Sequence, residues 1–373
     1  MSETSTALKD RLSPALVADI AARITAVDPR FDAPRFVAEA AAGLDALTLM
    51  ARAEHVSQAL ERALPRDVVE ALDTLVASMH PVSPSGQSFG DALFFYLPYS
   101  RFIARVGRGH YGPSMDAMHA LTQRMSSEFC IRPFIEDNPD LALQYFTKWV
   151  SDPSLHVRRL VSEGTRPRLP WAGRLTVFAA RPEPIYALLE ALVDDPELYV
   201  RRSVANHLND LSRSDPEGLL ARCAAWLKAR PSRHPVIAHA LRSMVKAGHR
   251  GALALLGGTA APAHRYRLDA ALSTRALCIG DKLTVKVTLD GLEATDAVVN
   301  VDLVCFFIKK AGDAAPKVFR GARLSLAEAG PQRFQKTIHF AQFSTRTVYP
   351  GPHKIALRVD GTDREIGTVD VKP

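Results

Sequence analysis

The chain has 373 residues, of which 47% are hydrophobic, and it carries a formal net charge of +7 with a pI near 9.3. This composition excludes a disordered chain, and the length allows two or three domains that each bury a large core. The positive charge favours a polyanionic partner over a neutral one, although many basic proteins bind nothing special.

Several further classes are excluded by simple patterns. The four cysteines are scattered without a C-x-x-C pair, which is typical of a reduced cytosolic protein. No H-E-x-x-H motif is present, so we expect no metal site. Residues 1–11 lack the apolar region of a signal peptide, and no apolar run is long enough to span a bilayer. We therefore expect a soluble cytoplasmic protein.

From Leu8 to Leu256 the apolar residues recur at helical spacing, as in Val56, Leu60 and Leu64. Alanine, leucine and arginine dominate this region, and all three are good helix formers. Prolines divide it into segments of two to four helical turns: Pro65, Pro81, Pro98, Pro113, Pro139, Pro153, Pro184, Pro196, Pro216 and Pro231. The pattern predicts an all-α domain over residues 1–256.

An internal repeat indicates how these helices are organised. Residues 149–161 align with residues 192–204, and each copy contains D-P-x-L-x-V-R-R-x-V. The aspartates, Asp152 and Asp195, are 43 residues apart, and each is expected to cap a helix that starts at the following proline. A period of about 40–47 residues with two helices per unit is HEAT-like. We therefore predict a HEAT-like repeat solenoid with a concave binding surface.

Beyond a small, loop-like linker at residues 257–264, the period changes to two. Alternating apolar stripes include Leu283, Val285, Val287 and Leu289; Val299, Val301, Leu303, Cys305 and Phe307; Ile338 and Phe340; Ile355, Leu357 and Val359; and Ile366, Val369 and Val371. Six or seven short strands over residues 265–373 fit an all-β immunoglobulin-like sandwich. No tryptophan follows Trp226, so the Cys…Trp…Cys signature of antibody domains is absent and no such disulfide is expected.

A basic stretch lies within the helical region. Between residues 156 and 181 there is one carboxylate, Glu163, and six arginines: Arg158, Arg159, Arg166, Arg168, Arg174 and Arg181. Guanidinium groups match the geometry of phosphates, so this density favours phosphate binding over a merely solvated helix face.

Glu163 precedes Gly164, the expected C′ residue of a helix, where the helix dipole disfavours a carboxylate by several tenths of a kcal/mol. A catalytic role and an ion pair with Arg159 are both open explanations. Glu128 lies 35 residues earlier in a similar Ser-Glu pair, and it is expected at an equivalent position of the preceding repeat unit unless it is an ordinary surface residue. Two carboxylates on an arginine-lined wall would repel phosphate, so the pair favours an enzyme that stabilises positive charge.

Trp171 follows Pro170 in the stretch Arg-Pro-Arg-Leu-Pro-Trp. A lone tryptophan is most often part of a core. Between prolines and arginines its ring face is also suited to contact a sugar or a cationic base.

Two stretches, residues 126–134 (SSEFCIRPF) and residues 158–171 (RRLVSEGTRPRLPW), resemble the signatures of AlkC-type 3-methyladenine DNA glycosylases, which are HEAT-like alkylpurine glycosylases. The resemblance covers nearly the whole chain, including the C-terminal immunoglobulin-like domain. It implies excision of 3-methyladenine and 3-methylcytosine from duplex DNA without base flipping. It assigns the catalytic carboxylates to Glu128 and Glu163, the tryptophan to Trp171, and motif arginines to Arg159 and Arg166.

The chemistry of the residues agrees with this resemblance. A carboxylate and a tryptophan face both stabilise an oxocarbenium-like sugar, while Arg158, Arg159, Arg166 and Arg168 are expected to bind DNA. The expected partner is alkylated double-stranded DNA, bound by a monomer without cofactor or metal, away from membranes, in the bacterial cytoplasm and nucleoid. A basic group in the β-domain, Lys309, Lys310, Lys317, Arg320 and Arg323, either contacts DNA or belongs to a passive module. The main alternatives are a non-catalytic HEAT-like scaffold that binds DNA or an acidic protein, and a related glycosylase for bulky adducts.

Overall fold

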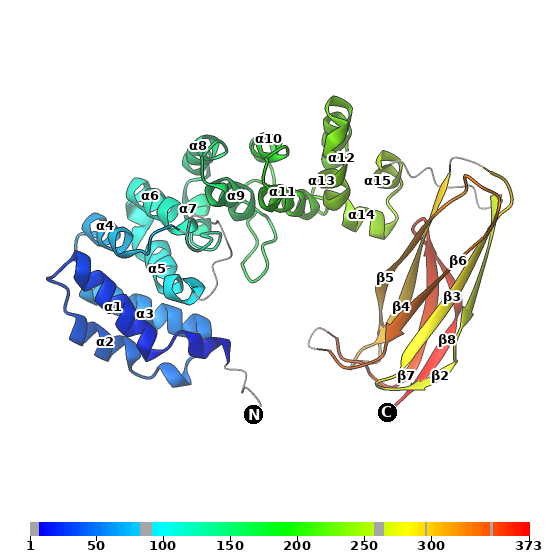
Figure 1. Ribbon diagram of the computed structural model, residues 1–373, viewed down its shortest axis with the longest axis horizontal. Coiled ribbons are helices and arrows are strands. Elements are labelled where there is room, and N and C mark those ends of the chain that lie inside the picture. Colours follow the sequence, from blue (N-terminus) through cyan, green and yellow to red (C-terminus); the bar gives the residue numbers. More distant parts are fainter. Residues whose placement is uncertain (1–6, 83–91, 257–264, 295–296, 344–345) are drawn as a thin grey trace. The chain divides into compact units, whose positions relative to one another are not determined.

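Helices fill the first two-thirds of the chain and strands fill the last third, which confirms the predicted order of an all-α region followed by an all-β region (Figure 1). The computed structural model describes residues 7–82, 92–256, 265–294, 297–343 and 346–373. The chain forms two compact units, Met1–Ser214 and Asp215–Pro373. The predicted linker, residues 257–264, lies outside the described residues, so the predicted domain boundary there remains a prediction. None of the described helices has the length and apolar character needed to cross a membrane.

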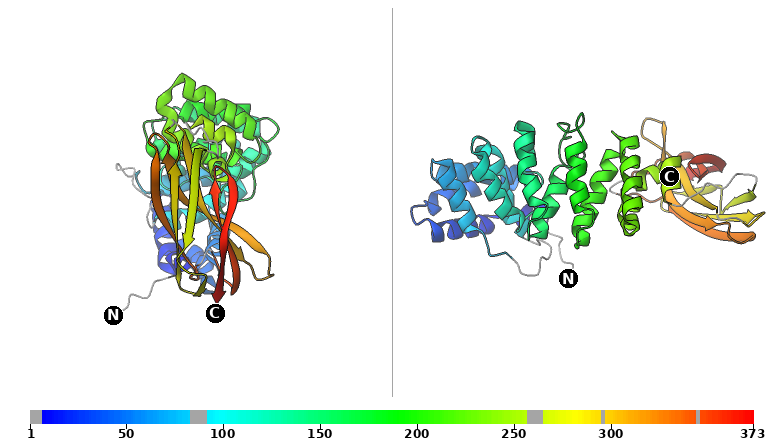
Figure 2. Two further views of the ribbon diagram at one scale, coloured as in Figure 1. Left: turned by 90° about the vertical axis from the view of Figure 1, so that its right-hand side faces the viewer. Right: turned by 90° about the horizontal axis from the view of Figure 1, so that it is seen from above.

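The helices of the first unit pack against their near neighbours in the chain, α1 on α2 and α4, α3 on α5, α4 on α6, and α9 on α11 (Figure 2). Their bounds are α1 Pro14–Val27, α2 Ala33–Ala41, α3 Leu49–Ala63, α4 Val68–Ser78, α5 Ala92–Val106, α6 Tyr111–Thr122, α7 Arg132–Asp137, α8 Pro139–Trp149, α9 Leu155–Gly164, α10 Glu183–Leu192 and α11 Leu198–Leu211. The second unit begins with α12 Pro216–Ala229, α13 His234–Ala240, α14 Arg242–Ala247 and α15 Arg250–Leu255.

Several helices begin where proline follows a capping side chain. The side chains of Ser13, Asn138 and Asp215 accept hydrogen bonds from backbone N–H groups of the first turn, and each is followed by proline at the first helical position. Pro98 departs from the prediction, because it lies inside α5 and does not end a helix. The buried aromatic face of Phe95, Tyr99 and Phe102 favours a continuous α5 despite the missing N–H donor of that proline.

The repeat is real, but its aspartates do not cap helices as predicted. α9 and α11 begin at Leu155 and Leu198, two residues beyond the prolines. The Asp152 carboxylate instead accepts the N–H of Ser154 at 2.8 Å, and Asp195 accepts that of Glu197 at 2.8 Å. Each aspartate therefore forms an Asx-type turn before its helix, a local bond that competes with the N-cap.

The same aspartates link one repeat unit to the next. Asp195 accepts two hydrogen bonds from Arg158 of the preceding unit, at 2.6 and 3.2 Å. Asp152 correspondingly accepts a hydrogen bond from Nε2 of His119, at 2.7 Å. The repeated Asp-Pro motif therefore joins adjacent units as well as forming the turn that precedes each helix.

The strands of the second unit form two sheets in the orders β1-β3-β6 and β2-β8-β7-β4-β5. Their bounds are β1 Tyr266–Leu272, β2 Ala276–Cys278, β3 Lys282–Gly291, β4 Val298–Ile308, β5 Ala314–Ser325, β6 Gly330–His339, β7 Gly351–Val359 and β8 Thr362–Lys372. All ladders are antiparallel except that of β2 with β8. The inward side chains of both sheets share one buried core, as the predicted sandwich requires.

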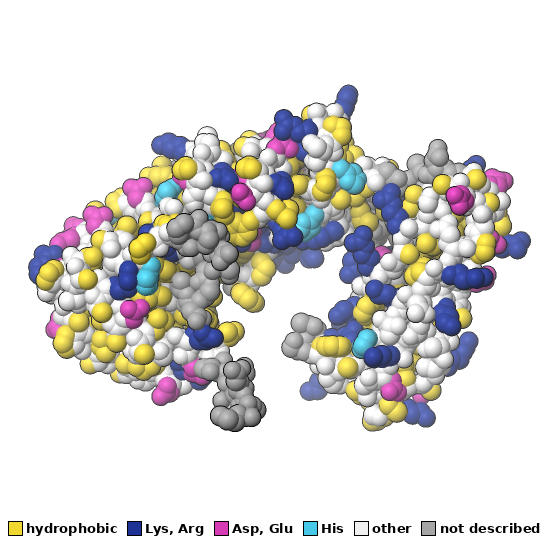
Figure 3. Space-filling model, viewed as in Figure 1, with side chains coloured by type: hydrophobic (Ala, Val, Ile, Leu, Met, Phe, Trp, Pro, Cys, Tyr) yellow, Lys and Arg dark blue, Asp and Glu magenta, His cyan; other side chains and the backbone are white. Residues whose placement is uncertain are grey.

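The predicted apolar stripes fall on β3, β4, β7 and β8 and on the end of β6, whereas β1, β2 and β5 were not predicted. All four cysteines are free. The β7–β8 hairpin turns at Asp360 and Gly361, both with positive φ, as a two-residue hairpin requires. Figure 3 shows Lys and Arg side chains over β4 and β5, and Lys317, Arg320 and Arg323 are exposed on β5.

We predict that Asp195→Ala destabilises the repeat stack by about 2–4 kcal/mol, because it leaves the nearly buried Arg158 without its carboxylate. Asp140→Ala is the control, since Asp140 forms an exposed ion pair with Arg181 and its loss should cost less than about 1 kcal/mol. Denaturant unfolding of the two variants measures the difference. Equal midpoints would show that the Asp195–Arg158 link does not hold the units together.

Candidate active site

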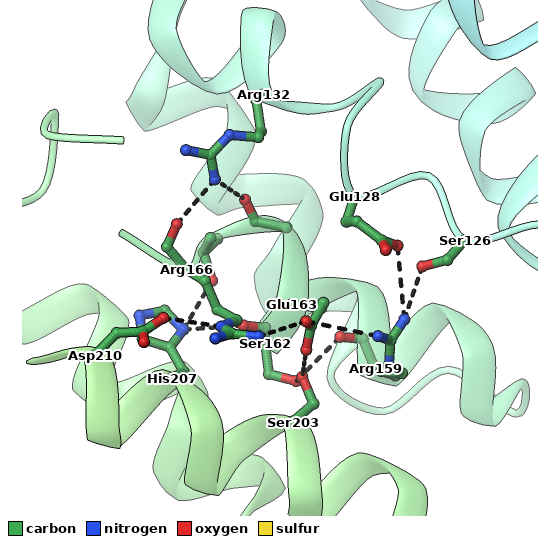
Figure 4. Close-up of polar contacts among 12 residues, drawn as sticks. Ser126, Glu128, Arg132, Arg159, Ser162, Glu163, Arg166, Ser203, His207 and Asp210 are labelled. Atoms are coloured by element: carbon green, nitrogen blue, oxygen red, sulfur yellow. Dashed lines mark hydrogen bonds and ion pairs between the residues drawn. The ribbon is translucent and has the colours of Figure 1, made fainter. Parts of the chain in front are cut away.

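Glu163 lies in the last turn of α9 and is only 6% exposed. Its Oε1 accepts a hydrogen bond from Nη1 of Arg166 at 2.7 Å, and its Oε2 accepts the hydroxyl of Ser203 at 2.7 Å (Figure 4). The predicted ion pair with Arg159 is also present, with 3.6 Å between Nη2 and Oε1. These donors offset the unfavourable helix dipole that the sequence indicated at this position.

Gly164 ends α9 with helical backbone, not as the left-handed C′ residue that was predicted. A side chain at this position would collide with Ile131, because a Cβ would lie 2.8 Å from its Cγ2 atom. Glycine is therefore required here by close packing between α9 and the segment before α7.

Glu128 lies in the segment between α6 and α7, whereas Glu163 lies on a helix. The prediction that the two glutamates occupy equivalent positions of adjacent repeat units is therefore wrong. Both side chains nevertheless reach the same group, since Oε2 of Glu128 lies 3.6 Å from Nη1 of Arg159. This is an ion-pair distance, and the buried Oε2 atom has no hydrogen-bond partner among the described residues. The two glutamates therefore face one arginine, as a shared site demands.

Arg159 is fixed between these carboxylates by two further contacts. Its Nη1 donates to the hydroxyl of Ser126 at 2.7 Å, and its guanidinium lies 4.7 Å from the centre of the Tyr199 ring. Its side chain is 16% exposed. Among Glu128, Glu163, Asp210, Arg159 and Arg166, carboxylates outnumber cations by one, so the cluster favours an additional positive charge.

The surroundings of the two glutamates shift their pKa values in opposite directions. Burial raises the pKa of Glu128, and the negative charge of Glu163 adds to this effect against the opposing Arg159. Burial also acts to raise the pKa of Glu163, but Arg159, Arg166 and the Ser203 hydroxyl outweigh it and hold that pKa below its ordinary value. Two carboxylates with separated pKa values can take different roles in proton transfer.

Besides Arg159, two of the predicted DNA-binding arginines have carboxylate partners within the chain. Arg158 binds Asp195, and Arg166 donates to both Glu163 and Asp210, with 2.9 Å between its Nε and Oδ2 of Asp210. These contacts account for both side chains within the folded protein, and DNA binding by either remains a prediction.

Trp171 lies in the segment between α9 and α10 and is 99% exposed, so it is not a core residue. Its backbone is left-handed, with φ of 63°, which is unusual for a residue other than glycine. The neighbouring Arg168 is half-buried and has no ion-pair partner among the described residues. Neither residue, nor Arg158, forms a hydrogen bond or ion pair with the two glutamates in the described part of the chain.

Sequence reasoning missed three residues that build this cluster and one that lies outside it: Ser203, Asp210 and Tyr199, and beside the cluster Arg132. The first three lie on α11, in the repeat copy that packs on α9, so the alignment of the two copies pointed to the element but not to the side chains. Arg132 lies directly after the segment 126–131 and is 5% exposed. It donates to backbone carbonyls of Gly164, Arg166 and Gly173, which joins the two signature stretches.

A cavity of about 260 Å³ opens beside Glu128 and Arg159. Apolar and aromatic side chains form most of its wall, including Leu97, Phe129 and Tyr199. The cluster therefore borders a mostly apolar cavity, which is the kind of space that ligand-binding sites commonly contain.

Comparisons with known proteins agree with this arrangement. Residues 267–373 match the family model described as the C-terminal Ig-like domain of the uncharacterised protein YhaZ. The uncharacterised protein YhaZ of Bacillus subtilis strain 168 is 30% identical over 315 residues, which are 84% of this chain and 85% of the relative.

A solved structure is similar over almost the whole length. The alkylpurine DNA glycosylase AlkC of Pseudomonas fluorescens, bound to DNA that contains an abasic site analog, is 33% identical and superposes with a TM-score of 0.87. The match covers 99% of this chain and 100% of that one. On the strength of this full-length similarity, the chain belongs to the family of the alkylpurine DNA glycosylase AlkC.

Proposed function

We propose that this protein is a DNA glycosylase that hydrolyses the N-glycosidic bond of cationic N3-alkylated bases, 3-methyladenine and 3-methylcytosine, in duplex DNA. The observation that carries the proposal is the convergence of two glutamates, Glu163 buried and Glu128 half-buried, on Arg159, in a cluster with excess negative charge. The full-length similarity to AlkC, whose structure contains DNA with an abasic site analog, supports DNA as the partner.

The chemistry requires a group that stabilises positive charge. An N3-alkylated base is already cationic, so it leaves as a neutral base when the electron pair of the C1′–N bond moves to it, and no general acid is needed. The deoxyribose then becomes oxocarbenium-like, and the oxygen of a water molecule bonds to C1′ while its proton passes to a carboxylate. Carboxylates aimed at this sugar favour the transition state over the ground state.

The two glutamates suit the two parts of this reaction. Glu163, whose pKa is lowered, remains ionised and supplies the fixed negative charge. Glu128, whose pKa is raised and whose Oε2 has an unused acceptor site, accepts the proton of the water. Arg159 keeps both carboxylates in place without neutralising both.

Trp171 and the arginines complete the proposed site. The exposed ring of Trp171 contacts the cationic nucleoside, and Arg168, together with Arg159, contacts phosphates. Arg158 and Arg166 contribute positive charge to the same surface while they orient Asp195 and Glu163. The base is cleaved without being flipped into a pocket, in contrast to most enzymes that act on bases. The protein acts as a monomer without metal or cofactor, on DNA in the bacterial cytoplasm.

We predict that Glu163→Gln reduces release of 3-methyladenine from methylated duplex DNA by about a hundredfold or more, because the transition-state charge loses its buried counter-charge. DNA affinity should be unchanged or higher, since one negative charge is removed from a phosphate-binding surface. Single-turnover chromatography of released bases, with a parallel binding titration, measures both.

Glu183→Gln is the matched control, because it removes one exposed carboxylate from α10 and should leave both quantities unchanged. Base release at the normal rate by Glu163→Gln would refute the role of Glu163. A wild-type protein that binds DNA but releases no base from methylated or bulky-alkylated DNA would instead be a non-catalytic scaffold.

We predict that the rate of base release falls as pH is lowered through the raised pKa of Glu128, above the ordinary glutamate value of about 4.3. The substrate stays cationic throughout this acidic range, so its own charge does not produce the acid limb. In Glu128→Gln the rate should be lower, and its remaining acid limb should move to lower pH, because only Glu163 with its depressed pKa remains. An acid limb that stays at the same pH in this variant would assign the titration to another group.

We also propose that the β4–β5 hairpin contacts DNA through Lys317 and Arg320, which are exposed on β5. Replacing both by glutamate should weaken the salt dependence of DNA binding. The slope of the logarithm of the association constant against the logarithm of the salt concentration should become less steep by about 1 for each phosphate that the variant no longer neutralises. Lys282→Glu and Lys372→Glu, exposed on other strands, are charge-matched controls. An unchanged slope in the β5 variant would mark the domain as a passive module.

A further inference from the structure

The segment that carries Trp171, residues 165–175, is here called the Trp171 loop. Its most unusual feature is that a fully exposed tryptophan adopts a left-handed backbone. Such a conformation costs about 1–2 kcal/mol for a residue with a side chain. The exposed ring recovers no burial energy, so other contacts of the loop must hold this conformation.

Some of these contacts lie within the loop. Leu169 and Leu175 are buried, and the N–H of Leu175 donates to the carbonyl of Pro167 at 3.1 Å. The N–H of Ala172 donates to the carbonyl of Leu169 at 3.2 Å. They close the loop on itself. Arg166 attaches the start of the loop to α9, because its side chain donates to Glu163 at 2.7 Å.

The far side of the loop, at Gly173, is attached by Arg132, the first residue of α7. Its Nη1 donates to the carbonyl of Arg166 at 2.8 Å and lies 3.5 Å from that of Gly164, while its Nη2 donates to Gly173. One guanidinium therefore holds the end of α9 and both sides of the Trp171 loop, and the planar fork of arginine suits several fixed acceptors at once.

Burying Arg132 costs desolvation free energy that a neutral side chain would avoid. Arg132 is 5% exposed, and burial lowers its pKa. No carboxylate forms an ion pair with it in the described ranges. Its hydrogen-bond acceptors are backbone carbonyls, and Glu136 favours its charged form only from a longer distance. A buried cation without a paired counter-ion is unfavourable for stability alone. It fits a role in which the positions of the backbone carbonyls that it binds matter for function.

We propose that Arg132 is a positioning residue for base excision, which acts through Trp171 by fixing the Trp171 loop relative to Glu163 at the end of α9. The inference rests on the proposed function, because it takes Trp171 to stabilise the cationic nucleoside. It adds a residue of the first signature stretch that contacts neither glutamate but determines where the tryptophan lies.

A double-mutant cycle on the full chain tests this coupling. Trp171→Ala and Arg132→Gln should each lower the single-turnover rate about tenfold, the loss expected for a cation–π contact of roughly 1.4 kcal/mol. The double variant should be no slower than Trp171→Ala alone, because an absent ring cannot be misplaced. Arg132→Lys should fall between wild type and Arg132→Gln, since an ammonium group reaches fewer of the three carbonyls.

Arg124→Gln is the matched control for general destabilisation. Arg124 is also partly buried with a lowered pKa, and it also donates to backbone carbonyls, those of Ala120 and His80. Any loss of rate that this variant causes should multiply with that of Trp171→Ala. Multiplicative losses for Arg132→Gln and Trp171→Ala would overturn the inference.

A second measurement does not depend on glycosylase activity. In a Trp149→Phe, Trp226→Phe background, Trp171 is the single tryptophan, and Arg132→Gln should speed the decay of its fluorescence anisotropy while Arg124→Gln should not. Unchanged anisotropy would also overturn the inference. A wild-type protein that releases no base, with faster anisotropy decay in Arg132→Gln, would refute the proposed function while leaving the structural role of Arg132 intact.

Discussion

The sharing of Arg159 between Glu128 and Glu163 is the interaction on which the proposed site depends. Two carboxylates buried side by side would repel each other, and at least one would take up a proton. One arginine at 3.6 Å from each lowers this repulsion without cancelling both charges. Ser126 and the Tyr199 ring hold the arginine in turn, so the arrangement exists before any ligand binds. Such preorganisation is what electrostatic catalysis requires.

The stacking of repeat units supplies the rest of the site. α11 packs on α9, and it brings Ser203 to Glu163 and Asp210 to Arg166. The same stacking pairs Arg158 with Asp195. The arginines of the basic stretch therefore differ in their surroundings. Arg158 and Arg166 bind carboxylates within the folded chain, whereas Arg168 has no ion-pair partner among the described residues.

The opposite pKa shifts of the two glutamates connect this architecture with the chemistry. Glu163 has several donors and keeps its charge, whereas Glu128 is buried with an unused acceptor atom. A cationic leaving base needs no proton, so a site with a fixed charge and a proton acceptor is sufficient for hydrolysis. The exposed Trp171 lies in a separate loop that Arg132 anchors.

Local patterns were enough to predict the helical repeats and most strands of the β-sandwich, because periodicity is carried by residues near one another in the chain. The signature stretches also indicated Glu128, Glu163, Arg159 and Trp171 as candidate site residues, whose roles remain predictions. These patterns could not predict that Asp152 and Asp195 form turns, that Gly164 packs on Ile131, or that Arg158 and Arg166 bind carboxylates. Those outcomes depend on partners 30 or more residues away or on competing local bonds. Only the tertiary packing of α9 between α11 and the α6–α7 segment decided which charges meet and which remain available for a ligand.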